Sequence, residues 1–151
     1  MSDVAVVDAA RIVVGVDGSE PSKAALRWAV RQAELTGDAV VAVIAWDFPR
    51  NWTGWPPPGD PSFDWEDSAR KILTEAIDQA TGPDHPVEIR TRVVQGHPAA
   101  VLLNEAKNAA LLVVGNRGHG GFSEALLGSV GQHLTQHATC PVLVVRGLQP
   151  R

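Results

Sequence analysis

The sequence predicts an α/β fold, an open parallel sheet of five strands with helices on both faces. Short apolar runs alternate with longer segments whose apolar residues recur at helical spacing, which is typical of strand–helix–strand units. The central apolar runs carry no charge, as strands buried on both faces require. The chain has 151 residues, 44% hydrophobic and 20% charged, so we expect one ordinary globular domain rather than a disordered or fibrous chain.

The first half of the chain supplies two strands and two helices. Between the first strand and helix, Asp17–Pro21 has the residue types of a turn and a helix cap, and Gly37 is a stop signal for that helix. In chain order we expect a strand at Arg11–Val16, a helix at Ser22–Thr36, a strand at Ala39–Trp46 and a helix at Asp67–Thr81.

The second half supplies three strands and two helices. The third strand alternates apolar residues with Glu88, Arg90 and Arg92, so one of its faces is expected to be wet. In chain order we expect a strand at Val87–Val94, a helix at Pro98–Ala109, a strand at Leu111–Gly115, a helix at Ser129–Ala138 and a strand at Pro141–Val145.

The segment Asp47–Glu66 is a long proline-rich loop that contains Trp52, Trp55 and Trp65. Loops of this length are uncommon in compact domains and are often functional. We favour a proline-stiffened surface excursion whose tryptophans pack back onto the sheet. A lid or a partner site is the alternative, because aromatic residues are enriched at interfaces.

Composition excludes several classes of protein. The formal net charge is −4, with 17 acidic and 13 basic residues, which argues against a general nucleic-acid binder. No apolar run approaches the roughly 18 residues of a membrane span. Residues 1–10 lack a basic residue, so we interpret them as a flexible tail before a domain at 11–147, not as a signal peptide. Cys140, the single cysteine, excludes an internal disulfide, and together these features predict a reducing cytoplasm.

A glycine-rich stretch follows the fourth strand. In open parallel sheets, ligands bind beyond the carboxyl ends of the strands. Gly115-Asn-Arg-Gly118 follows that strand directly, and Gly128-Ser129 precedes the last helix. Close backbone approach and the N–H groups of a helix start form a cradle for phosphate. The alternatives are ordinary turns and a Ser129 that only caps its helix, since neither GxxxxGK[ST] nor GxGxxG is present.

The spacing Gly115-x2-Gly118-x9-Gly128-Ser129 resembles the ATP-binding motif of the universal stress protein family, without a mismatch. Three further segments resemble the family's first strand and loop, third-strand exit and closing strand. They are Ile12-Val-Val-Gly-Val-Asp-Gly-Ser19, Val94-Gln-Gly-His-Pro98 and Pro141-Val-Leu-Val-Val145. The resemblance covers residues 10–146. One departure is Gly131, where many members carry Thr or Ser.

The resemblance implies a Rossmann-like nucleotide-binding sheet in the strand order 3-2-1-4-5, with Asp17 facing the Gly115 loop across a crevice. It implies ATP as the ligand, with Mg²⁺ as an accompanying ion. Position by position it places adenine near Gly15, Val16 and Ala45, the nucleoside near Asp17, and the phosphates near Arg117 and Gly118, with Val114 and Gly115 lining the site and Gly128, Ser129 and Val130 closing over it.

Single residues keep alternative interpretations. Asp17 is favoured as a ligand for ribose or a cation over a simple turn residue, whereas Arg117 fits a phosphate contact and a solvated loop equally. His133 and His137 have the spacing of a zinc pair, but no glutamate follows His133 as a metalloprotease requires, so we expect no metal site. Ser123 lacks the partners of a hydrolase nucleophile.

No catalytic residue is therefore expected, and slow ATP hydrolysis is the most that the sequence supports. The function that fits is an ATP-binding, nucleotide-dependent module for regulation or sensing in a stress response. The alternative is a nucleotide-independent scaffold that uses Trp52–Trp65. The strand Pro141–Val145 has no charge before Arg146, and a bare apolar edge invites pairing. A two-fold homodimer through this strand is expected.

Overall fold

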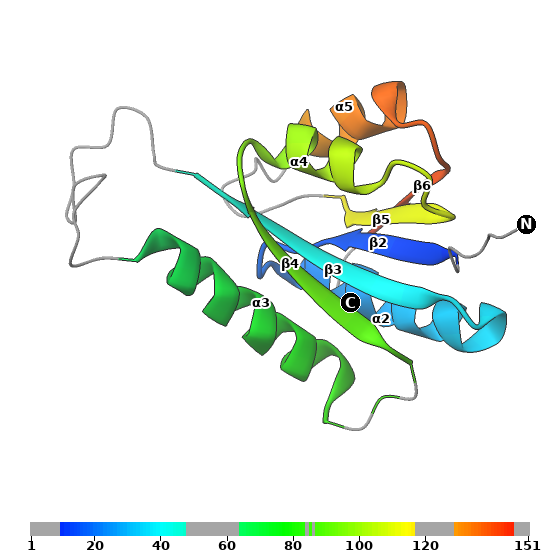
Figure 1. Cartoon of the computed structure of the whole chain (residues 1–151). Coiled ribbons are helices and arrows are strands. Elements are labelled where there is room, and N and C mark those ends of the chain that lie inside the picture. Colours follow the sequence, from blue (N-terminus) through cyan, green and yellow to red (C-terminus); the bar gives the residue numbers. More distant parts are fainter. Residues whose placement is uncertain (1–9, 48–63, 84, 86, 117–128, 147–151) are drawn as a thin grey trace, which may run out of the picture.

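The computed structural model describes residues 10–47, 64–83, 85, 87–116 and 129–146 (Figure 1). Strands and helices alternate along these residues. In chain order they are β2 (Arg11–Gly15), α2 (Glu20–Thr36), β3 (Ala39–Trp46), α3 (Trp65–Thr81), β4 (Ile89–Gln95), α4 (Pro98–Glu105), β5 (Leu111–Gly115), α5 (Ser129–His137) and β6 (Val142–Val145).

The described strands form one parallel sheet in the order β4-β3-β2-β5-β6. This confirms the order 3-2-1-4-5. The first strand in the chain, β2, is central: Arg11 pairs with Ala39 of β3 on one side, and Ile12 pairs with Leu111 of β5 on the other. The carboxyl ends of β2 and β5 are therefore neighbours, although the chain between them is long.

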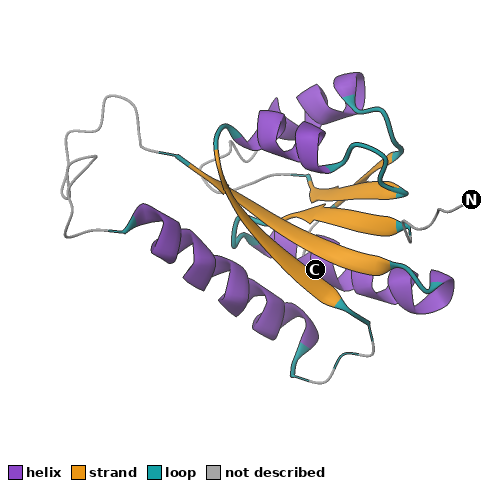
Figure 2. Cartoon of the chain, in the orientation of Figure 1, coloured by secondary structure: helices purple, strands orange, loops and turns teal. Residues whose placement is uncertain are grey.

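Helices cover both faces of the sheet (Figure 2). On one face, α2 and α3 pack against the strands in a core cluster that includes Leu26 and Leu73. On the other face, a second cluster includes Leu102 of α4 and Leu134 of α5. Burial on both faces explains why the central strands contain only apolar residues and glycine after Arg11.

Capping side chains move two helix starts away from the positions that hydrophobic periodicity predicts. Helix α2 begins at Glu20 rather than Ser22, because Ser19 caps it and accepts a hydrogen bond from the backbone N–H of Ser22. Helix α3 begins at Trp65 rather than Asp67, because Asp64 accepts from the N–H of Asp67 at 3.0 Å. Trp65 therefore belongs to the helix and not to the long loop.

The later elements differ by a few residues from the prediction. Helix α4 ends at Glu105 rather than Ala109, and the chain then turns through Asn108, which has a φ of 64°. Strand β4 runs from Ile89 to Gln95. Its arginines are exposed as expected, but Thr91, which falls on the apolar side of the alternation, is exposed as well.

Some predictions lie outside the described residues. Among them are the tail at 1–9 and, within the long loop, Trp52 and Trp55. Trp46 at the end of β3 is described, and it packs against the core cluster on the α2 and α3 face. None of the helices in the described part of the chain has the length and apolar character needed to cross a bilayer.

Candidate functional site

The carboxyl ends of β2 and β5 form a topological switch point. The helix that follows β2 packs on one face of the sheet, and α5, the helix that follows β5, packs on the other. Beyond the paired residues Val14 and Val113, the two strands continue side by side to Gly15 and Gly115. A crevice between diverging connections at this position is where open α/β sheets bind ligands.

Asp17 follows the end of β2 and is held by the first turn of α2. Its Oδ1 accepts hydrogen bonds from the backbone N–H of Ser19 at 2.9 Å and from the Ser19 hydroxyl at 2.5 Å. Its own N–H donates to Ser22 Oγ at 3.4 Å. These hydrogen bonds agree with the interpretation of Asp17 as a turn residue. A ligand role is compatible with them, since a carboxylate accepts about four hydrogen bonds.

Two glycines at the strand ends have packing partners. A Cβ atom at Gly115 would lie 2.7 Å from the carbonyl carbon and the Cβ of Pro21 in α2. A Cβ atom at Gly15 would lie 2.7 Å from Leu102 Cδ1 in α4. Both distances are far inside van der Waals contact. Gly115 needs glycine because backbone atoms of α2 approach it, whereas at Gly15 the neighbour is the end of a flexible side chain.

Apolar side chains surround this end of the sheet on the α4 face. Val114 is 5% exposed, and Ala45 at the end of β3 and Val130 in α5 pack against the same core cluster. Val16 is buried on the opposite face, and its N–H donates to Val43 O at 2.8 Å. Of these four predicted residues, Val114, Ala45 and Val130 pack on the α4 face of the sheet and Val16 packs on the other.

The predicted phosphate residues are only partly described. Arg117, Gly118 and Gly128 lie outside the described residues. Ser129 is the first residue of α5. A short connection joins the end of α5 to β6, so the helix runs back along the sheet and its N-terminus points toward the carboxyl edge (Figure 1). Helix starts present unpaired N–H groups and partial positive charge.

A polar contact also joins the ends of β3 and β4. The Gln95 side-chain amide donates to Asp47 Oδ1 at 3.4 Å. The N–H of Gly96 donates to Trp46 O at 2.8 Å, and Gly96 has a φ of 144°, which favours glycine. The next residue, His97, caps α4 by accepting from the N–H of Ala99 at 3.2 Å.

Sequence reasoning missed the residues that contact the ends of β2 and β5. They are Ser19, Pro21 and Ser22 of the α2 start and Leu102 of α4. Two serines three residues apart at a helix start are a signal for capping that could have identified the first of these contacts. Nothing in the linear pattern links Pro21 to Gly115 or Leu102 to Gly15.

The histidines of α5 contact each other. The rings of His133 and His137 stack with centroids 4.3 Å apart, and His137 Nδ1 lies 2.9 Å from His133 O. Because a carbonyl oxygen only accepts, this nitrogen carries the proton. Within the described part of the chain, no three His, Cys, Asp or Glu side chains gather as metal ligands.

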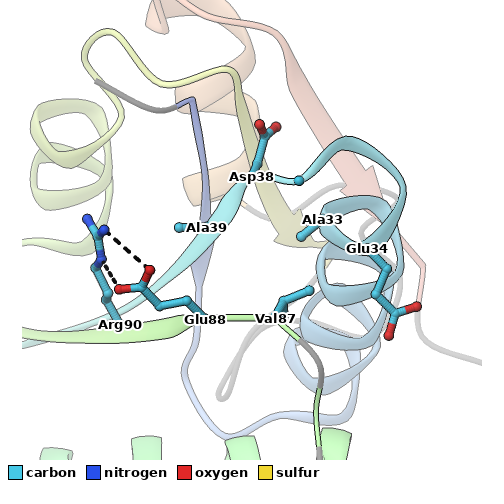
Figure 3. A pocket seen from close by; sticks show the side chains of 8 residues that line it. Ala33, Glu34, Asp38, Ala39, Val87, Glu88 and Arg90 are labelled. Carbon is cyan, nitrogen blue, oxygen red and sulfur yellow. Dashed lines mark hydrogen bonds and ion pairs between the residues drawn. The ribbon is translucent and has the colours of Figure 1, made fainter. Parts of the chain in front are cut away.

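A hollow of about 540 Å³ lies at the opposite, amino edge of the sheet, between the end of α2 and the starts of β3 and β4 (Figure 3). Arg90 Nε donates to Glu88 Oε2 at 2.7 Å on its rim. This hydrogen bond, and then the charge of Arg90, lower the pKa of Glu88, and Glu88 raises the pKa of Arg90 in the same way. The hollow is remote from the switch point. Its Glu88–Arg90 ion pair is exposed to solvent and does not mark a ligand site.

A model of the universal stress protein family matches residues 9–146. The chain belongs to the universal stress protein family. The match covers every described strand and helix, including both sides of the switch point. It confirms the family that the glycine spacing and the strand-end segments indicate.

Curated universal stress proteins of mycobacteria are similar to this chain. One from Mycolicibacterium smegmatis is 40% identical over 138 residues, which span 89% of this chain and 45% of that protein. One from Mycobacterium tuberculosis strain H37Rv is 35% identical over 140 residues, 91% of this chain and 45% of that protein. The chain thus spans about half the length of the curated relatives that it matches.

Solved universal stress protein structures have the same fold. One, described as a universal stress protein in complex with cAMP, is 30% identical, with a TM-score of 0.68 over 93% of this chain and 98% of that chain. One from Archaeoglobus fulgidus in complex with dAMP is 21% identical, with a TM-score of 0.62 over 90% and 97% of the two chains. The second likeness concerns the fold alone.

Proposed function

We propose that this universal stress protein binds ATP in the crevice between β2 and β5 and acts in the cytoplasm as a nucleotide-dependent module for regulation or sensing in a stress response. The observation that carries the proposal is the strand order, since it makes the Asp17 turn and the Gly115 strand end neighbours. One wall then offers a carboxylate for ribose hydroxyls, and the other leads into the glycine-rich segment that reaches the start of α5.

A relative supports a nucleotide as the ligand class. The solved family member with 30% identity is described as a complex with cAMP, an adenine nucleotide. The motif Gly115-x2-Gly118-x9-Gly128-Ser129 adds the expectation of a longer phosphate chain, because it supplies several backbone donors beyond those that one phosphate needs. ATP is therefore preferred over cAMP in this proposal.

The acidic character of the chain does not oppose this ligand. The net charge is −4, yet the donors of the proposed cradle are backbone N–H groups of glycines and of a helix start, which carry no formal charge. Arg117 adds one side chain that suits phosphate, and Mg²⁺ bound with ATP would neutralise further charge. No residue is assigned as a general base, so hydrolysis of the bound ATP is at most slow.

Nucleotide content and calorimetry test the proposal. We expect chromatography of denatured, freshly purified protein to release ATP, and calorimetric titration of nucleotide-free protein to give tighter binding of ATP than of AMP or cAMP. Gly128→Val should weaken ATP binding at least about tenfold, because a side chain there blocks close backbone approach. Ala100→Val, on an exposed position of α4, is the matched control and should bind as the parent does.

Two results would contradict the proposal. One is a purified protein that contains no nucleotide and gives no heat with ATP. The other is a Gly128→Val variant that retains full affinity. Gly115→Val is a poorer probe, since its side chain would collide with Pro21 and disturb packing whether or not a ligand binds.

We also propose that two copies of the chain pair through β6. This strand is an edge of the sheet, and Val142–Val145 are only half-buried, although all four are apolar. An apolar edge with unpaired N–H and C=O groups favours pairing with another strand. Light scattering that finds only a 16 kDa species at micromolar concentration would contradict the dimer.

A further inference from the structure

The buried polar side chains among the described residues are those of Ser19 and Ser22, at 7% and 3% exposure. Both lie at the start of α2. A buried hydroxyl costs free energy unless it is hydrogen-bonded, so the partners of these two groups show what the fold uses them for.

The two hydroxyls connect α2 to the end of β2. Ser22 Oγ donates to Ser19 O at 2.9 Å and accepts from the N–H of Asp17 at 3.4 Å. Ser19 Oγ accepts from the N–H of Ser22 at 3.3 Å and donates to Asp17 Oδ1 at 2.5 Å. The Ser22 hydroxyl therefore holds the backbone of Asp17 directly, whereas the backbone N–H of Ser22 bonds the Ser19 hydroxyl that holds the carboxylate.

The same turn of α2 also contacts the end of β5. Gly115, at the end of β5, lies so close to Pro21 that no Cβ atom fits between them. A displacement of this turn is therefore transmitted to Gly115 by contact and to Asp17 by hydrogen bonds. The ends of β2 and β5 therefore both contact one short segment, Ser19–Ser22.

We propose that Ser22 is a positioning residue for the nucleotide site. Its hydroxyl fixes the backbone of Asp17, and with it the place from which the carboxylate projects, and joins that strand exit to the turn whose Pro21 packs against Gly115. This inference rests on the proposed nucleotide binding in that crevice. The two hydrogen bonds from Ser19 both end on one oxygen of the Asp17 carboxylate, Oδ1.

Helix capping alone does not account for Ser22. Ser19 is the N-cap of α2, and Pro21 occupies the first turn, where its fixed φ favours the helix. The bond from the Asp17 N–H reaches out of the helix to the strand exit, and a helix start does not need it. A residue that served only the helix would make its bonds within the helix.

Three substitutions at Ser22 separate positioning from stability. Ser22→Ala removes the hydroxyl. Ser22→Cys keeps the size of the side chain but replaces the hydroxyl with a weak hydrogen-bonding group. Ser22→Thr keeps the hydroxyl, which in a helix bonds the carbonyl three or four residues back. Val30→Ala, in the buried stripe of α2 away from its first turn, is the control for stability alone.

The measurement is calorimetric titration of each nucleotide-free, full-length variant with ATP and with AMP, beside a thermal unfolding curve. We expect Ser22→Ala and Ser22→Cys to weaken both nucleotides by the same factor, about five- to tenfold, which corresponds to the loss of one hydrogen bond at the nucleoside end. Ser22→Thr should restore the affinity to within about twofold. Val30→Ala should lower the unfolding temperature and leave both affinities unchanged.

The outcomes distinguish the two proposals. If the parent chain binds neither ATP nor AMP, the proposed function fails, and the positioning role falls with it. If the parent binds and both Ser22→Ala and Ser22→Cys bind equally well, only the positioning role is overturned. An affinity loss in Val30→Ala as large as that in Ser22→Cys would also overturn it, because general destabilisation would then explain the result.

Discussion

Gly115 at the end of β5 packs directly against Pro21 in the first turn of α2, so that a Cβ atom at Gly115 would lie 2.7 Å from the Pro21 carbonyl carbon and 2.9 Å from its oxygen. Strand β5 and helix α2 are far apart in the sequence, and this contact fixes how the helix meets the strand end. A glycine of the family's ATP-binding motif therefore has a packing function in addition to any contact with a ligand.

Gly115→Ala is expected to destabilise the fold even without nucleotide. The added methyl group meets backbone atoms, which cannot move aside as a flexible side chain does, and such overpacking costs about 1–3 kcal/mol. Urea denaturation of the nucleotide-free protein measures this change. Gly37→Ala is the control for an added methyl group that meets no neighbour: its φ of 81° strains the new residue, but no atom lies within 4 Å of the added Cβ. Equal stability of Gly115→Ala and the parent chain would show that the turn relaxes at no cost.

Gly15→Ala is expected to be milder, because its methyl group meets the end of the Leu102 side chain at 2.7 Å. Leu102→Val shortens that side chain and should relieve the collision. We expect the double variant to be more stable than the sum of the single changes predicts, by at least about 0.5 kcal/mol. A double-mutant cycle by chemical denaturation measures the coupling, and strictly additive single changes would contradict the contact.

The ion pair between Arg92 and Glu105 should contribute modestly to stability. Arg92 Nε and Nη2 donate to the two carboxylate oxygens at 3.0 and 2.9 Å, and this raises the pKa of Arg92. The Glu105 side chain is only 12% exposed, whereas that of Arg92 is 56% exposed. With screening by solvent, Arg92→Ala should cost about 0.5–1 kcal/mol.

Arg90→Ala is the matched control for this ion pair. Arg90 lies on the same strand, but its partner Glu88 is itself exposed, so its loss should leave the urea midpoint unchanged. Equal effects of the two substitutions would mean that burial of Glu105 adds nothing. The cost of Arg92→Ala should also shrink at high salt.

Cys140 should react slowly with alkylating reagents. Burial raises the pKa of its thiol, so less of the reactive thiolate is present at neutral pH. The protonated thiol is favoured in the folded chain, and its contribution to stability is lost as the pH rises through the raised pKa. Iodoacetamide labelling followed by mass spectrometry should show slower modification of the folded chain than of the urea-unfolded chain. Equal rates at pH 7 would contradict this.

The strand positions were predictable because burial on both faces leaves a plain signal. Ala39–Trp46 and Leu111–Gly115 have the predicted bounds, and each is an unbroken apolar run closed by a glycine or a polar residue. The order of the strands came from resemblance to a family, since the pairing of Ile12 with Leu111 leaves no local trace in the sequence.

The strand ends of the candidate site were predictable from the sequence, but the α2 residues that contact them were not. The glycine at position 115 indicated that another group approaches the backbone closely, and we interpreted that group as a bound ligand. The structure adds Pro21 as a partner that no spacing rule identifies. Ser22 was assigned only as the first helical residue, because a side chain that bonds backward to a strand exit is visible only after the helix is placed.

The central position of β2 has a consequence for the order of folding. Its pairing with β3 closes a loop between Arg11 and Ala39, whereas its pairing with β5 joins Ile12 to Leu111, more than three times farther along the chain. Closing the longer loop costs about 1 kcal/mol more in chain entropy, and non-local pairings of this kind slow folding. The half-sheet of β2, β3 and β4 can form early, and the β2–β5 seam then joins it to the remaining strands. The proposed nucleotide would lie across that late-forming seam, so its binding should slow unfolding much more than it speeds refolding.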